Sequence, residues 1–75
     1  MKQHNILEML DEARFLKNEL EETERAIKLC DKILEIDSNN RDAMLIKAGG
    51  LKELGEVERF LSLSKEIIEK WPRTS

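Results

Sequence analysis

The feature that most limits the fold is the spacing of apolar residues, which follows the period of an α-helix. If successive side chains lie about 100° apart, the segment from Val57 to Trp71 divides into an apolar arc of about 160° and an opposite, mainly charged arc. The segment from Ala26 to Ile36 has the same two-sided pattern. No segment alternates polar and apolar residues as a half-buried strand would. The sequence therefore predicts an all-α protein.

The two amphipathic segments are also related by an internal repeat, because a shift of 34 positions superimposes identical residues. The pairs are Glu19 and Glu53, Leu20 and Leu54, Glu22 and Glu56, Glu24 and Glu58, Arg25 and Arg59, Leu29 and Leu63, Ile33 and Ile67, and Glu35 and Glu69. The apolar pairs keep the same helical phase. A repeat of this length indicates a supersecondary unit that occurs twice.

Turn and capping residues divide the chain into four helices. The stretch DSNN, residues 37–40, is a turn in which Asn39 or Asn40 can cap the next helix. Gly55 marks another turn, and Pro72 ends the last helix. The expected helices run roughly over Asn5–Leu20, Glu22–Ile36, Arg41–Leu54 and Glu56–Trp71. Short links between amphipathic helices predict antiparallel hairpins.

Two adjacent glycines, Gly49 and Gly50, lie within the third expected helix, in the stretch MLIKAGGLKELGE. Each glycine costs about 1 kcal/mol relative to alanine inside a helix. The pair marks either a break between two short helices or a continuous helix that lies very close to a neighbour. Residues Met44, Ala48 and Leu51 keep helical spacing across the pair, which favours the continuous helix.

The repeat resembles the tetratricopeptide repeat, a family built from 34-residue helical hairpins. The stretch ERAIKLCDKILEIDSNN is similar to the second helix and exit turn of one unit, with Ala26 at a small-residue position. The stretch GEVERFLSLSKEIIEKWP is similar to the next unit, and Pro72 lies where the family has proline. The resemblance implies one domain over residues 1–75, with units at about 7–40 and 41–74 stacked as a short α-solenoid.

The resemblance also gives the glycine pair a role. In this register Ala48 and Gly50 face closely packed neighbours, and Gly49 faces the concave side. The sequence departs from the family pattern at several positions, which are Arg14 and Phe60 in place of small residues, Ser38 in place of proline, and Ile33 and Ile67 in place of alanine.

Composition and charge limit the classes of function that the chain can have. The chain has 75 residues, 39% of them charged, and a net charge of −3, so it lacks the basic patch that attracts a nucleic-acid backbone. The single cysteine cannot form an internal disulfide, and no apolar run approaches the length of a membrane span or a signal peptide. We therefore expect a soluble, cytoplasmic protein that binds neither nucleic acid nor membranes.

Catalysis is not expected. His4 is the only histidine and has no partner at metal-ligand spacing, so a solvated side chain is the simplest interpretation. Cys30 lies on an apolar face without an activating histidine, which predicts a buried core thiol. The glycine pair lacks the lysine of a phosphate-binding loop. A cluster of carboxylates coincides with a helix start, where acidic residues suit the helix dipole; it comprises Glu19, Glu21, Glu22 and Glu24. We expect no metal or cofactor.

The resemblance implies a module that binds a protein or peptide through the first helix of each unit. The expected contacts from the first unit are Glu8, Asp11, Phe15, Asn18 and Glu19, and those from the second are Leu45, Gly49, Lys52 and Glu53. The family's carboxylate clamp has lysine and asparagine where this chain has Asp11 and Phe15. Binding of a chaperone tail is therefore not expected.

Two alternatives remain open for the function. The apolar arc of the fourth helix is wider than one helix contact needs, and its Val57, Leu61 and Ile68 edge is where a following helix packs in the family. With no capping helix after it, this edge is expected to meet a second copy in a two-fold homodimer. The chain could instead be a fragment of a longer repeat protein.

Overall fold

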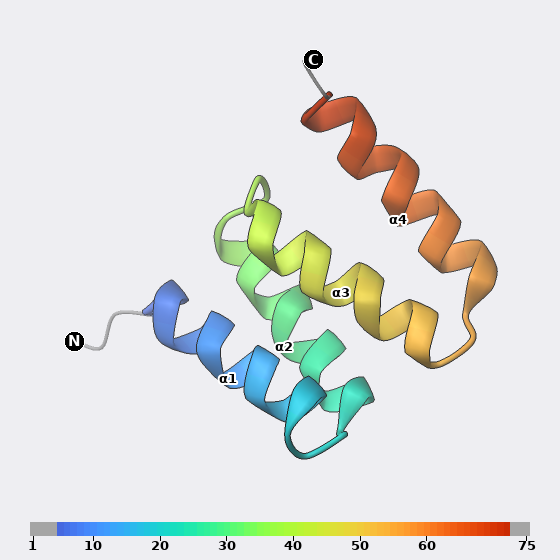
Figure 1. Cartoon of the computed structure of the whole chain (residues 1–75). Helices are drawn as coiled ribbons and strands as arrows, with labels where there is room; N and C mark the ends of the chain where they lie inside the picture. Colours follow the sequence, from blue (N-terminus) through green and yellow to red (C-terminus); the bar gives the residue numbers. More distant parts are fainter. Residues whose placement is uncertain (1–4, 73–75) are drawn as a thin grey trace.

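The chain forms four α-helices that follow one another in space as they do in sequence (Figure 1). The computed structural model describes residues 5–72. The helices are α1 (Ile6–Asn18), α2 (Thr23–Ile36), α3 (Arg41–Glu53) and α4 (Val57–Lys70). The predicted all-α architecture of four helices is confirmed. His4 and the residues of the second unit after Pro72 lie outside the described range.

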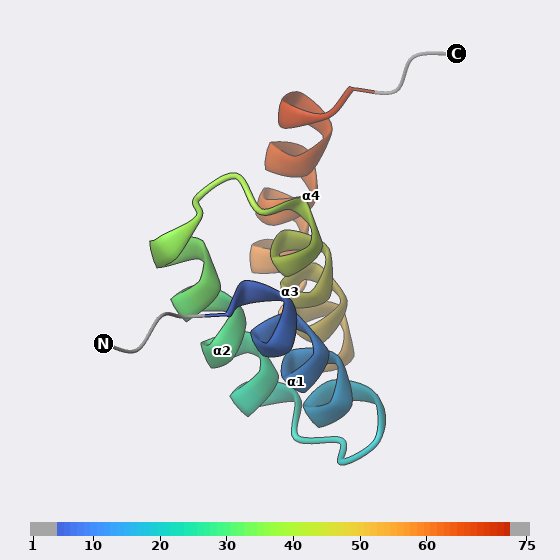
Figure 2. The same ribbon diagram turned by 90° about the vertical axis from the view of Figure 1, so that its left-hand side faces the viewer.

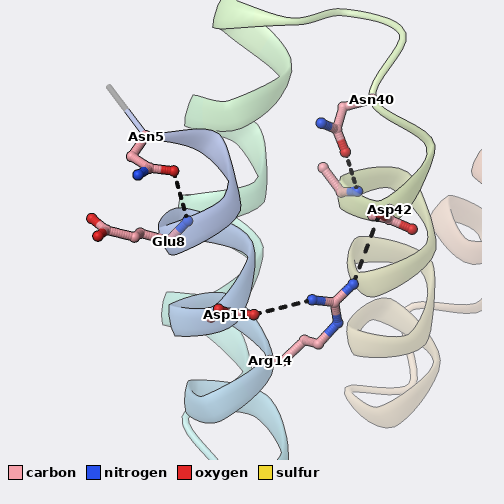
Figure 3. Close-up of polar contacts among 7 residues, drawn as sticks. Asn5, Glu8, Asp11, Arg14, Asn40 and Asp42 are labelled. Atoms are coloured by element: carbon pink, nitrogen blue, oxygen red, sulfur yellow. Dashed lines mark hydrogen bonds and ion pairs between the residues drawn. The ribbon is translucent and has the colours of Figure 1, made fainter. Parts of the chain in front are cut away.

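The first helix of each hairpin begins at an asparagine cap. The Oδ1 atom of Asn5 accepts a hydrogen bond from the backbone N–H of Glu8 at 3.2 Å, and that of Asn40 accepts one from Ala43 at 2.9 Å (Figure 3). Each bond pairs an N–H that the helix itself leaves without a partner, which is why asparagine is favoured at this position. Of the two caps considered for α3, Asn40 is the one used.

The turn between α3 and α4 closes with a glycine in the left-handed region. Gly55 has a φ of 76°, and the N–H of the following Glu56 donates to the carbonyl of Leu51 at 2.9 Å. Glycine is suited to this place because it lacks the Cβ atom that makes positive φ costly. The predicted turn at Gly55 is confirmed.

The turn between α1 and α2 is one residue longer. Glu21 occupies the left-handed region with a φ of 56°, and the N–H of Glu22 donates to the carbonyl of Leu16 at 2.7 Å. As a result, α2 and α4 begin 34 residues apart, whereas α1 and α3 begin 35 apart. The one-residue difference changes which residues of the two first helices correspond.

The register expected for the first helix is therefore wrong by one residue. Arg14 was expected at the closely packed position equivalent to Ala48, but its side chain is 45% exposed. Ala13 is completely buried and lies 35 residues before Ala48, so it is the true counterpart. The repeat was recognised from the second helices and the turns before them, and the longer first turn shifts everything before it.

Helices that are consecutive in the chain pack against each other, and one further contact joins α1 and α3. Within residues 5–72, α4 contacts α3 alone. Viewed from the side, α1 lies in front of α3, and α2 lies beside them (Figure 2). The buried core lies among the first three helices and contains Leu10, Ala13, Cys30, Ile33 and Ala43.

The glycine pair lies within an unbroken α3, so the predicted continuous helix is confirmed. A Cβ atom at Gly50 would lie 2.9 Å from Ile27 Cγ1 and 3.1 Å from Thr23 Cγ2, closer than side chains normally approach. Gly50 therefore lets α3 approach α2 directly. At Gly49 the nearest atom is Lys17 Cε of α1, at 3.1 Å.

The last helix is held differently from the others, because none of its residues is buried. Its contacts with α3 include Lys52 Nζ at 5.9 Å from the Phe60 ring, and the Arg41 guanidinium at 6.0 Å from the Trp71 ring. Lys70 Nζ also donates to Asn39 Oδ1 in the turn before α3, at 2.7 Å. These contacts fix one edge of α4 and leave the opposite edge exposed.

Candidate peptide-binding groove

An open groove lies between α1 and α3, and we call it the α1–α3 groove. It has a volume of about 310 Å³ and is lined by Arg14, Lys17, Asn18, Asp42, Leu45 and Ile46. Each helix contributes three residues with the same i, i+3, i+4 spacing, which places them on one face of that helix. The groove thus combines two cations, a carboxylate, an amide and two apolar side chains.

Arg14 spans the groove from α1 to α3. Its Nη1 atom lies 3.5 Å from Asp11 Oδ1, and its Nη2 atom lies 3.9 Å from Asp42 Oδ2 (Figure 3). The two carboxylates are largely exposed and Arg14 is about half exposed, and exposed ion pairs of this kind contribute only about 0–1 kcal/mol. The guanidinium can therefore exchange these contacts for those of a ligand at little cost.

Polar contacts that begin at the lining residue Lys17 join three helices. Lys17 Nζ of α1 lies 3.0 Å from Glu53 Oε2 of α3, and the hydroxyl of Thr23 in α2 donates to Glu53 Oε1 at 3.1 Å. The hydrogen bond from Lys17, supported by that from Thr23, lowers the pKa of the Glu53 carboxyl below its ordinary value. This carboxylate joins helices rather than facing the groove.

The structure brings together some of the predicted contact residues and separates others. Asn18 and Leu45 line the same groove, and Asp11 reaches it through its ion pair with Arg14. Gly49 lies beneath Lys17, and Lys52 lies over Phe60 of α4 instead.

Three predicted contacts on α1 lie away from this lining. Glu8 and Phe15 are exposed on the helix, with Phe15 at 52%, and Glu19 is the exposed C-cap. Their role in binding stays a prediction.

Sequence reasoning missed four of the lining residues, which are Arg14, Lys17, Asp42 and Ile46. The two from α1 were hidden by the register, because the shift of 35 residues makes Arg14 the counterpart of Gly49 and Lys17 the counterpart of Lys52. Comparing the two asparagine caps, Asn5 and Asn40, would have revealed the correct shift.

The cysteine is inaccessible, as predicted. Cys30 is completely buried, and burial, reinforced by the neighbouring Asp31 carboxylate, raises the pKa of its thiol to about 11. A thiol rather than a thiolate is present at neutral pH, and it is a poor nucleophile.

Residues 5–72 form four short helices. No group of three or more histidine, cysteine or acidic side chains is placed there to hold a metal ion. None of the helices in this range combines the length and the apolar character that crossing a membrane requires.

Comparisons with known proteins give no relative that would identify the groove. The chain matches no protein-family model, no curated protein and no solved structure. The class of protein that can be stated is a small all-α domain of four sequentially packed helices.

Proposed function

We propose that this chain is a tetratricopeptide-like module that binds a protein or peptide segment in the α1–α3 groove. The proposal is supported by the packing of α3 against both helices of the preceding hairpin, together with the family-like features of the sequence. The observation that carries it is the groove itself, in which accessible polar groups and the half-exposed Leu45 lie side by side.

The lining suggests which chemistry a bound segment would offer. Arg14 can pair with a carboxylate through two parallel hydrogen bonds, and Asn18 can donate to and accept from a peptide backbone. Leu45 and Ile46 offer apolar contact for one side chain of the ligand. We infer an extended segment that carries an acidic residue near an apolar one.

The proposed activity is binding without catalysis. In the groove, the Arg14 guanidinium pairs with Asp42, and the Lys17 ammonium pairs with Glu53. Charged groups held in this way can position a partner through charge and hydrogen bonding.

The test is selection of displayed random peptides on the immobilised protein, followed by calorimetric titration of the enriched sequences. Leu45→Glu and Arg14→Glu should each weaken binding by about tenfold or more, because they remove the apolar contact or reverse the charge. Leu20→Glu, in the turn after α1, and Arg25→Glu, on α2, make the same changes at exposed positions outside the groove lining and should leave affinity unchanged. Equal affinity for groove and control variants would place binding elsewhere and contradict the proposal.

A further inference from the structure

The edge of α4 that α3 leaves free carries a regular apolar stripe, here called the α4 stripe. It consists of Val57, Leu61, Ser64 and Ile68, spaced four, three and four residues apart. Val57 is 60% exposed, Leu61 58% and Ile68 65%. Alternating steps of three and four are the spacing by which two helices pack along a common seam.

The equivalent residues of α2 are already used for helix packing. Shifted by 34 residues, Val57 corresponds to Thr23 and Leu61 to Ile27, which are buried against Gly50 of α3. In α2 this edge is therefore covered by a helix. The α4 stripe has the same position in its hairpin, and within residues 5–72 no helix covers it.

We propose that the α4 stripe binds the same stripe of a second copy of this chain, with the two α4 helices antiparallel about a two-fold axis. In this arrangement Val57 packs against Ile68 of the partner subunit, and Leu61 packs against Ser64 of the partner subunit. Each contact then occurs twice, as a two-fold interface requires. The inference concerns a different face from the α1–α3 groove and does not depend on the function proposed for it.

The charged residues beside the α4 stripe indicate which partner it binds and in which direction the partner helix runs. Glu58 and Lys65 lie seven residues apart along one border of the stripe, so they occupy equivalent positions on the helix. An antiparallel partner brings Lys65 of the partner subunit beside Glu58, and the two-fold axis repeats this pair. Neither side chain forms an ion pair with another residue in the range 5–72.

A parallel pair would lose this complementarity. In a parallel pair, each Lys65 would lie beside Phe60 of the partner subunit, because Phe60 is on the opposite border of the stripe. Glu58 would then have no opposite charge beside it. Phe60 and Ile67, on that border, are half-buried on the side that faces α3. Glu58 and Lys65, on the other border, are exposed, and their charge pattern matches an antiparallel copy of the same helix.

The interface is small, so the expected dimer is reversible. Each copy contributes three exposed apolar side chains, far fewer than the twenty or so residues per side of a typical stable interface. Because the dimer is reversible, its dissociation constant can be measured by sedimentation equilibrium of the full chain over a wide concentration range.

The charge pair gives a test that is specific to the antiparallel arrangement. Glu58→Lys and Lys65→Glu should each raise the dissociation constant by about tenfold, since each replaces two attractive pairs by two repulsive ones. The double swap should restore the original value. Glu66→Lys makes the same charge change on the opposite side of α4 and should have no effect. Circular dichroism of each variant checks that it is folded.

A second pair of variants tests the apolar contact. Leu61→Glu should raise the dissociation constant by about a hundredfold, because it would bury two charges at the seam. Leu7→Glu makes the same change at an exposed leucine of α1 and should leave dimerisation intact. A folded protein that remains monomeric at all concentrations would overturn the proposal, as would a double swap that fails to rescue. The first result would assign the stripe to a different partner, and the second would exclude the antiparallel seam.

Discussion

The second helices of the two hairpins, α2 and α4, have similar sequences but differ in how many of their residues are buried. They have the same length, and their residues correspond at a shift of 34. Five residues of α2 are buried, whereas α4 has none. Ile27 is 8% exposed, and its counterpart Leu61 is 58% exposed.

The difference comes from the neighbours and not from the helices themselves. α2 lies between α1 and α3, which cover two edges of its apolar face, but α4 contacts α3 alone within residues 5–72. An amphipathic helix therefore specifies a face that can be buried, and the number of neighbouring helices decides how much of that face is buried.

The largest expected effect is in the core of α2. Ile33→Ala should lower the free energy of unfolding by about 2–5 kcal/mol, because Ile33 is completely buried and its loss leaves a cavity. Ile67→Ala, at the equivalent but half-exposed position of α4, should cost about 1 kcal/mol. Urea denaturation of both variants measures the difference. Equal losses would mean that α4 is packed as firmly as α2.

The next effect concerns the close approach of α3 to α2. Gly50→Leu should cost about 1–3 kcal/mol or more, since the new side chain would overlap Ile27 and Thr23. Gly49→Ala is the matched control and should be neutral or stabilising by up to about 1 kcal/mol, because alanine favours the helix and only the flexible end of Lys17 must move. Thermal or urea unfolding distinguishes them. Equal tolerance at both positions would contradict this packing.

A smaller effect is expected in the turns within the two hairpins, between α1 and α2 and between α3 and α4. Glu21→Gly should stabilise the protein by about 0.5–1 kcal/mol, because Glu21 has a positive φ that costs a residue with a Cβ atom about 1–2 kcal/mol. Gly55→Ala, in the equivalent turn, should destabilise it by about 1 kcal/mol although no atom lies near the added Cβ. Opposite shifts in melting temperature are expected, and a loss of stability in both variants would argue against a left-handed Glu21.

The smallest effect is the acid sensitivity of the contacts that join α1, α2 and α3. The pKa of Glu53 is lowered in the folded protein, so this carboxylate stabilises the fold above its ordinary pKa of 4.5, and the contribution is lost as the pH falls through the lowered value. Glu53→Gln should therefore reduce the difference in urea midpoint between pH 7 and acid. Glu66→Gln serves as the exposed control. An unchanged pH dependence in Glu53→Gln would show that the carboxylate contributes nothing.

Much of the local structure could be predicted from particular residues. The pair Asn39 and Asn40 identified a helix start, and Gly55 identified a turn, because such residues satisfy a local requirement of the backbone. The position of the groove was less predictable. The first turn has one residue more than the second, and this difference moves Arg14 and Lys17 into the lining. In the sequence, the spacing of the two caps Asn5 and Asn40 is the signal that reveals it.

The sequence by itself determined the helices, their order, the turn at Gly55 and the continuity of α3 through Gly49 and Gly50. These features depend on hydrophobic period, capping and backbone freedom, which act over a few residues. Only the tertiary structure decided that α2 is enclosed and α4 half-exposed, and that Glu53 joins three helices. Such outcomes depend on how many elements surround a side chain, and residues far apart in the chain supply those elements.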